Sequence, residues 1–189
     1  MKRNVDDSLY ERPPKQKVFV SSQMRGNVLV NERQAAAKAI NDTGFAFAWL
    51  WENDARTGPY SSEAICLGHA RTSEGLVLIL AKHLTPITQK EYEVANNTGV
   101  PRYVFLKQGT RHDPQVNRFI KNIRAKATTT GNFNNLSELE TQVKSALYRY
   151  AVDSVRKRIL ETKSKKSSIM RKTLEKIKEI VGSSTREKS

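Results

Sequence analysis

GLVLILAKHLTPITQKEYEVANNTGVPRYVFLK, residues 75–107, contains two short apolar runs on either side of a segment with helical spacing. The first run, at 75–80, is apolar throughout, which indicates a strand that is buried on both faces, as in a parallel sheet. The second run, at 101–107, also has the composition of a strand. A strand, a helix and a second strand in this order predict a βαβ unit with a right-handed crossover.

The same alternation extends on both sides of this unit. Strands are expected at 17–22, 45–51, 75–80, 101–107 and 128–133. A helix is expected after each strand: Gly44 closes the first one, and Pro114 lies in the first turn of the fourth. Ser137 and Glu140 have the spacing of a capping box at the start of the last helix. This order predicts a doubly wound α/β domain with four to five parallel strands.

The two ends of the chain differ from this α/β segment. Residues 1–16 are polar and contain two adjacent prolines, so we expect a disordered tail there. We assign residues 17–152 to the α/β domain and residues 153–189 to a basic helical extension. The extension contains twelve Lys or Arg against five Asp or Glu, and its net charge of +7 is half of the +14 of the whole chain.

The extension has its own internal pattern. KSKKSS at 163–168 is expected to interrupt the helix as a hinge. Met170, Leu174, Ile177 and Val181 then follow at intervals of four, three and four residues, which is the spacing of an amphipathic helix. This helix either packs on its own domain with a solvated basic face or binds a partner protein or nucleic acid.

The composition restricts the class of protein. The excess positive charge favours polyanionic ligands such as nucleic acid and nucleotides. Cys66 is the single cysteine, so no intramolecular disulfide can form, and a reduced, cytoplasmic setting is expected. No stretch approaches the roughly 20 apolar residues that cross a bilayer, so no membrane partner is expected.

Several common catalytic classes lack their motifs. GxGxxG, GxxxxGK[ST] and GxSxG are absent, which argues against dinucleotide-fold oxidoreductases, P-loop enzymes and α/β-hydrolases. The three histidines have no metal-type spacing with one another or with Cys66, so we predict no metal site and no cofactor.

The candidate site residues follow the strands. In an open parallel sheet, ligands bind beyond the carboxyl ends of the strands. The residues that lie there are Ser21, Ser22, Met24 and Arg25 after the first strand, Trp51 after the second, and Thr88 and Glu91 after the third. Hydroxyls, an indole, an arginine and a carboxylate in one cleft suit a ribose and an aromatic base. The simpler alternatives are that the serines cap a helix, that Trp51 belongs to the core and that Arg25 is a surface charge.

Glu91 is the most informative of these residues. It shares a helical stripe with Ile87, Val94, Ala95 and Thr98, on the side that should face the core. A carboxylate is costly there unless it is paired or used in chemistry, because its charged form loses water. The alternative is that the stripe is out of phase and Glu91 is solvated near a helix N-terminus, where negative charge is favourable.

These motifs resemble those of a known family. KVFVSS at 17–22, the Glu32-Arg33 pair and the Thr88, Glu91 and Ala95 triplet look like an uncharacterised bacterial domain family found at the start of many multidomain NTPase and immune-type proteins. That family is similar to TIR domains and to nucleoside deoxyribosyltransferases, which share a flavodoxin-like sheet. The resemblance covers about residues 17–150 and implies that Glu91 is the catalytic residue.

The resemblance implies an N-glycosidase in bacterial anti-phage defence, with NAD or a related nucleotide as substrate and a cyclic signal as one product. Breaking an N-glycosidic bond leaves positive charge at the anomeric carbon, which a carboxylate stabilises or attacks. Ser21 and Ser22 then hydrogen-bond the ribose or a phosphate, Arg25 pairs with a phosphate, and Trp51 stacks on the base. Met24 and Thr88 complete the expected binding set. A homo-oligomer or a partner protein is expected to support activity.

Two other functions are consistent with the same residues. One is a non-catalytic sensor or scaffold that binds a nucleotide and assembles through its last helix. The other is a protein that binds nucleic acid through the basic extension, with phosphate neutralisation as the main source of affinity.

Overall fold

The strands and helices follow the alternation in the sequence. The computed structural model describes residues 15–24, 26, 28–55, 58–126 and 128–184, with side chains described as far as residue 175. The strands are β1 (Gln16–Ser22), β2 (Ala46–Trp49), β3 (Gly75–Leu80), β4 (Arg102–Lys107) and β5 (Thr130–Phe133). The helices are α2 (Val30–Asn41), α3 (Trp51–Asp54), α4 (Ser62–Thr72), α5 (Pro86–Asn97), α6 (Pro114–Ala125) and α7 (Leu136–Ser184).

The strands in the described residues form one five-stranded parallel sheet with the order β2-β1-β3-β4-β5. This is the flavodoxin-like order. The chain runs from β1 to β2 on one side and then crosses over to β3 on the other side of β1. The winding therefore reverses between β1 and β3, and the carboxyl ends of these two strands flank the crevice where such sheets bind ligands.

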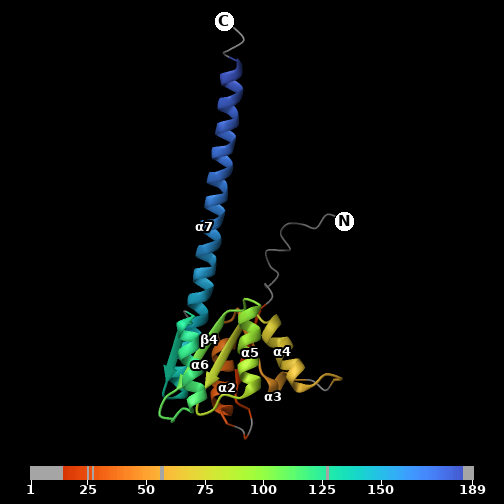
Figure 1. The fold of residues 1–189 in the computed structure, drawn as a ribbon, viewed down its shortest axis with the longest axis vertical. Coiled ribbons are helices and arrows are strands. Elements are labelled where there is room, and N and C mark those ends of the chain that lie inside the picture. The colour runs from red at the N-terminus through yellow and green to blue at the C-terminus, as the bar shows by residue number, and fades with distance from the viewer. Residues whose placement is uncertain (1–14, 25, 27, 56–57, 127, 185–189) are drawn as a thin grey trace. The chain divides into compact units, whose positions relative to one another are not determined.

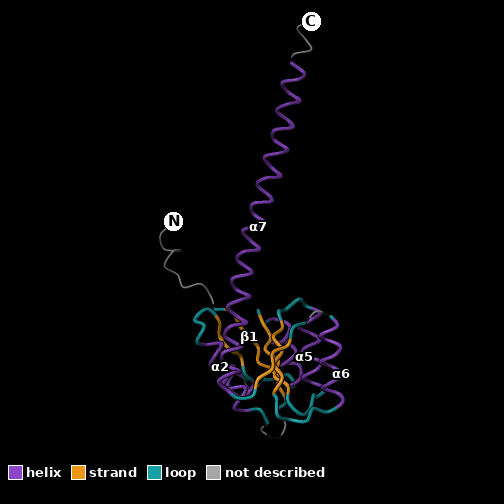
Figure 2. Tube along the Cα trace, turned by 90° about the vertical axis from the view of Figure 1, so that its left-hand side faces the viewer, coloured by secondary structure: helices purple, strands orange, loops and turns teal. Residues whose placement is uncertain are grey.

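Two apolar layers cover the faces of the sheet because successive residues of a strand point to opposite sides. Val18 and Val20 of β1 belong to a cluster that includes Ile40 of α2 and Leu139 of α7. Phe19, between the two valines, belongs to the cluster under α4, α5 and α6. Figure 1 shows α4, α5 and α6 side by side over one face, and Figure 2 shows the sheet edge-on, with α2 on one side and α5 and α6 on the other.

The second strand is shorter than expected. β2 ends at Trp49, and Trp51 begins the one-turn helix α3 instead of completing a strand at 45–51. Leu50 between them is buried, and its backbone N–H donates to the Asp54 carboxylate at 2.7 Å. The apolar run therefore extends beyond the end of β2, because Leu50 stays buried where the chain turns into α3.

The capping box of α7 lies two residues before the expected one. The Oδ1 atom of Asn135 accepts from the backbone N–H of Glu138 at 2.9 Å, and the Glu138 carboxylate accepts from the backbone N–H of Asn134 at 2.8 Å. The expected box of Ser137 and Glu140 is therefore wrong. Both pairs have the same spacing, and an asparagine caps a helix as well as a serine does.

The chain divides into two compact units, Met1–Leu147 and Tyr148–Ser189. Gln16 begins β1, so the expected tail at 1–16 is too long by at least one residue, and residues 1–14 lie outside the described residues. The hinge expected at 163–168 is not present, because α7 continues through it. Lysine is a good helix former, and each serine costs only about 0.5 kcal/mol in a helix. Within the described ranges, no helix combines the length and hydropathy of a membrane span.

Candidate functional site

Two adjacent serines at the end of β1 point to opposite faces of the sheet. Ser21 shares the face of Phe19, under α4 and α5, and its hydroxyl donates to the Glu91 carboxylate at 2.5 Å. Ser22 points to the other face, where its hydroxyl accepts from Arg33 of α2 at 2.8 Å. Both serines are buried. The end of β1 is thus tied to a helix on each side of the sheet.

Glu91 lies in α5 on the side that faces the sheet. α5 starts with Thr85, whose hydroxyl accepts from the backbone N–H of Thr88 at 3.2 Å, and with Pro86 in its first turn. Its buried residues are Thr88, Glu91, Tyr92 and Ala95, whereas Thr98 is exposed. The buried stripe is therefore rotated slightly from the expected one, and Glu91 lies at its centre. The side chain is only 5% exposed, which excludes the solvated alternative.

Burial makes the Glu91 carboxyl a weak acid. Loss of water raises its pKa to about 7, because the charged form is poorly solvated inside the protein. Hydrogen bonds from the Ser21 hydroxyl and the Cys66 thiol oppose this shift by stabilising the carboxylate. Near neutral pH, both the ionised and the protonated form of Glu91 are populated.

Cys66 of α4 is a second buried polar group at this place. Burial raises the pKa of its thiol to about 12, and the neighbouring Glu91 carboxylate adds to the shift. The thiol therefore stays protonated at neutral pH and acts as a hydrogen-bond donor to Glu91. Because the thiolate is the nucleophilic form of cysteine, Cys66 does not have the character of a catalytic nucleophile.

A pocket of about 520 Å³ opens beside Glu91. Its volume lies within the range of small-ligand sites. The lining residues come from the ends of β1 and β3 and from α3, α4 and α5: Ser22, Met24, Trp51, Ser62, Glu63, Cys66, Thr85, Pro86, Ile87 and Glu91. Four of the predicted site residues, Ser22, Met24, Trp51 and Glu91, are thus brought together around one cavity. Trp51 does so from α3 and not from a strand.

The other three predicted residues are placed differently. Ser21 donates a hydrogen bond to Glu91 but is not among the lining residues. Thr88 does not line the pocket either; it is buried, and its hydroxyl shares a hydrogen bond with that of Thr85 at 2.8 Å. Thr88 therefore supports the start of α5. Arg25 lies outside the described residues.

Arg33 is an organising residue that the sequence patterns did not single out as part of the site. Its side chain is 3% exposed and forms an ion pair with Glu52 of α3. It also donates to the Ser22 hydroxyl and to the carbonyl oxygens of Gln23 and Val28, at 3.1 and 2.9 Å. A single guanidinium thus joins the loop after β1 to the helix that carries Trp51. In the sequence, only the Glu32-Arg33 pair of the family resemblance pointed to this residue.

The wall formed by α4 was also not expected. Ser62 and Cys66 are four residues apart and therefore share a helix face. Glu63, at the rim, forms an ion pair with Lys90 of α5 at 2.8 Å, which joins the two helices. The helix itself was predicted, but its position beside α5 depends on the order of the strands. Only the folded sheet shows that the first turns of both helices meet.

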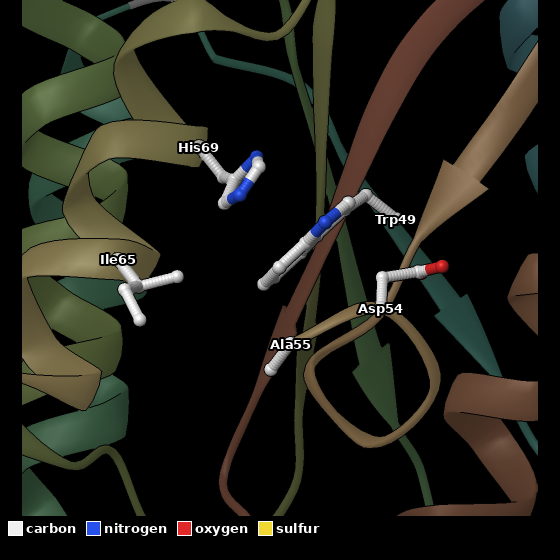
Figure 3. A pocket seen from close by; sticks show the side chains of 5 residues that line it. All are labelled: Trp49, Asp54, Ala55, Ile65 and His69. Carbon is white, nitrogen blue, oxygen red and sulfur yellow. The ribbon is translucent and has the colours of Figure 1, made fainter. Parts of the chain in front are cut away.

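A second hollow is also lined by residues of α4. Figure 3 shows the rings of Trp49 and His69 facing each other, with Ile65 and Asp54 nearby. The ring centroids are 3.8 Å apart, and the hollow has a volume of about 420 Å³. Burial lowers the pKa of His69, Lys17 lowers it further, and Asp54 opposes the shift. The Asp54 carboxylate accepts from the backbone N–H of Leu50 at 2.7 Å, so it holds the turn after β2.

No metal site accompanies these cavities in the described part of the chain, because no three His, Cys, Asp or Glu side chains come together there as ligands. Sheet order and site define a flavodoxin-like α/β domain with a buried carboxylate at its topological switch point. A family model described as "Domain of unknown function (DUF4062)" matches residues 17–148. The chain belongs to this family. No curated protein matches it.

Solved structures are similar to the chain at low identity. A conserved protein from Enterococcus faecalis V583 is 13% identical, with 70% of this chain and 99% of that one covered and a TM-score of 0.49. A flavodoxin from the domain Archaea is 11% identical, with 68% and 94% covered and a TM-score of 0.45. The Flv1 flavodiiron core from Synechocystis sp. PCC6803 is 14% identical, with 72% and 36% covered and a TM-score of 0.46. The chain thus spans about a third of that last protein.

Proposed function

We propose that the protein cleaves the N-glycosidic bond of NAD or a related nucleotide, with Glu91 as the catalytic residue. The observation that carries the proposal is the buried Glu91 carboxylate, which accepts from Ser21 and opens into the pocket beside Trp51. A carboxylate held out of water acts strongly on positive charge that develops in the transition state. The anomeric carbon of the ribose is where that charge develops.

The chemistry needs few groups when NAD is the substrate. The bond between the anomeric carbon and the ring nitrogen breaks, and both electrons go to the nitrogen, so nicotinamide leaves as a neutral molecule without a proton. Glu91 either attacks the anomeric carbon or stabilises it until water adds. The water oxygen then bonds to the carbon and loses a proton, which Glu91 accepts. A pocket with one reactive carboxylate is sufficient for this sequence of steps.

The charge of the pocket favours a cationic ring. The described lining residues include the Glu91 carboxylate and no Lys or Arg, and the second lining carboxylate, Glu63, is paired with Lys90. The nicotinamide ring of NAD is positively charged before cleavage, and an indole face such as that of Trp51 attracts cations at about 0.5–2 kcal/mol. A neutral purine or pyrimidine base would gain less from these groups. This contrast supports NAD over an uncharged nucleoside.

The family resemblance supports the same proposal and extends it to a role in bacterial anti-phage defence. Both TIR domains and nucleoside deoxyribosyltransferases act at an N-glycosidic bond, and Thr88, Glu91 and Ala95 match the spacing of the deoxyribosyltransferase motif. The resemblance also supports an assembly of several chains in the active form. Nicotinamide release is therefore best assayed over a wide range of protein concentrations.

The direct test measures the release of nicotinamide from NAD by the purified full chain, with liquid chromatography as the assay. We expect Glu91→Gln to reduce the rate by at least about 100-fold, because the neutral amide cannot stabilise the developing charge. Glu93→Gln is the matched control, since Glu93 lies on the same helix and is exposed. It is expected to keep full activity.

Two results would overturn the proposal. One is the absence of base release by the wild-type chain, at high protein concentration, from NAD, NADP and deoxynucleosides supplied separately. The other is a Glu91→Gln variant that releases nicotinamide at the wild-type rate. The two outcomes have different meanings, because the first excludes the reaction and the second excludes only the residue.

A further inference from the structure

The second unit carries a straight apolar stripe along α7. Val152, Val155, Ile159, Met170 and Leu174 are between about half and two thirds exposed, at 48, 56, 50, 67 and 53%. Their spacing repeats every eleven residues: Val152 and Leu174 are two repeats apart, and Ile159 and Met170 are one repeat apart. Because eleven residues make almost exactly three helical turns, such a pattern stays on one side of the helix. We call these five residues, together with Lys163 and Lys166, the α7 stripe.

Two lysines occupy the centre of this stripe. Lys163 lies eleven residues after Val152 and eleven before Leu174, and Lys166 lies eleven residues after Val155. Both side chains are exposed. No described residue forms an ion pair with either of them. The stripe is therefore apolar at both ends and doubly positive in the middle.

This arrangement argues against a second copy of the same helix. In a parallel pair in register, each central lysine faces its own copy. In an antiparallel pair, Val155 faces Leu174, Ile159 faces Met170, and Lys163 faces Lys166. In both arrangements four positive charges meet at the centre of the contact. If one helix of a parallel pair is shifted by eleven residues along the other, Lys163 is buried against apolar side chains instead. Like charges at such a seam are destabilising.

Nucleic acid and membrane fit the stripe less well than a helix does. Phosphate groups would use the lysines but would leave five large apolar side chains in water. A membrane-bound amphipathic helix keeps its charges on the polar face, whereas Lys163 and Lys166 lie within the apolar face. The complementary surface is a helix with apolar residues at both ends and carboxylates in the middle.

We propose that the α7 stripe docks an amphipathic helix of another protein, with two acidic side chains set opposite Lys163 and Lys166. The stripe from Val152 to Leu174 is about 33 Å long at 1.5 Å per residue, so the partner helix has about 22 residues. The apolar ends provide affinity, and the central charges determine which helix binds. This role is independent of the chemistry at Glu91.

The first test is the oligomeric state of the full chain by sedimentation velocity. The Lys163→Leu/Lys166→Leu double variant completes the apolar stripe and is expected to form a larger assembly than the wild type. Lys157→Leu/Lys165→Leu changes the charge equally, but these lysines lie on the other side of the helix, so this variant is expected to behave as the wild type. Self-association of the wild type that substitution of Ile159 and Met170 abolishes would overturn the proposal.

The second test uses two synthetic helical peptides of 22 residues with identical apolar ends and either two glutamates or two lysines at the centre. The full chain is expected to bind the glutamate peptide at least ten-fold more tightly than the lysine peptide. The Lys163→Glu/Lys166→Glu variant is expected to reverse this preference. Equal binding of both peptides, or a tighter complex with a DNA duplex or with phosphatidylserine vesicles that displaces the glutamate peptide, would exclude the proposed partner.

Discussion

The charge of Glu91 makes the stability of the folded protein depend on pH. Its folded pKa of about 7 lies above its ordinary value of 4.5. Below pH 4.5 the group is protonated in both the folded and the unfolded chain. As the pH rises from 4.5 to 7, the unfolded chain releases this proton more readily, so stability is progressively lost. The total loss is on the order of 3 kcal/mol above pH 7.

Glu91→Gln removes the titrating carboxyl group, so a comparison with the wild type measures how much this group changes the stability. At each pH we compare the melting temperature of the variant with that of the wild type. We expect this difference to be several degrees more positive at pH 8 than at pH 5. About 1 kcal/mol shifts the melting temperature of a domain of this size by about 2–4 °C. Scanning calorimetry at both pH values gives the difference. The exposed Glu93→Gln exchange should show the same small effect at both. A Glu91→Gln difference that does not depend on pH would mean that the carboxylate is not buried.

Ser21 controls the proton affinity of Glu91 through the hydrogen bond of 2.5 Å. The hydroxyl donates to the carboxylate and therefore stabilises its charged form. Ser21→Ala is expected to raise the pKa of Glu91 further, so a larger fraction of the carboxyl is protonated at pH 7. Carbon-13 NMR of a chain labelled at glutamate carboxyls measures this shift directly. An unchanged or lower pKa would contradict the hydrogen bond.

At the scale of elements, the edge of the sheet is protected by side chains of the preceding helix and turn. β2 is an edge strand, and its outward backbone N–H groups at Ala46 and Ala48 donate to Thr43 and Asn41, at 3.3 and 2.9 Å. An unpaired edge is otherwise a template for another strand. These two side chains occupy the donors that an added strand would need, so the sheet ends at β2.

The opposite edge depends on Gly131 in β5. A Cβ atom at this position would lie 2.5 Å from Oε1 of Gln142 and 2.9 Å from the ring of Phe105. Gly131→Ala is therefore expected to destabilise the domain by about 1–3 kcal/mol in urea unfolding. Gly68→Ala in α4 is the control, because nothing lies within 4 Å of its added Cβ, and the helix gains about 0.5–1 kcal/mol. Equal effects of the two exchanges would show that β5 is not closely packed.

The elements show what can be predicted from the sequence. The apolar run at 75–80 and the inward carboxylate of Glu91 follow from local periodicity, because burial on a strand or helix face leaves a repeat in the chain. Arg33 has no such signature: its partners lie on β1, the following loop and α3, and they meet only after the sheet has formed. Cys66 is similar, because its contact with Glu91 depends on the packing of α4 against α5.

At the scale of the whole molecule, α7 combines two different kinds of sequence. Leu139, Val143 and Leu147 are buried in the core of the first unit, whereas Val152 and Leu174 are about half exposed in the second. The expected domain boundary at 152 and the division of the chain after Leu147 both place these three core residues in the first unit. A helix prediction alone does not separate these parts, since helical spacing continues through both.

The roles of the two parts of α7 can be separated by truncation and by point variants. A chain of residues 1–152 is expected to unfold within a few degrees of the full chain. A chain of residues 1–135 is expected to be unfolded, because the loss of three buried apolar side chains, at roughly 2 kcal/mol each, approaches the whole stability of a domain. Leu139→Ala should cost about 2–5 kcal/mol in urea unfolding, whereas Leu174→Ala should cost almost nothing. If both leucine variants lost the same stability, the second unit would have to be part of the core, and the α7 stripe would no longer be free to bind another helix.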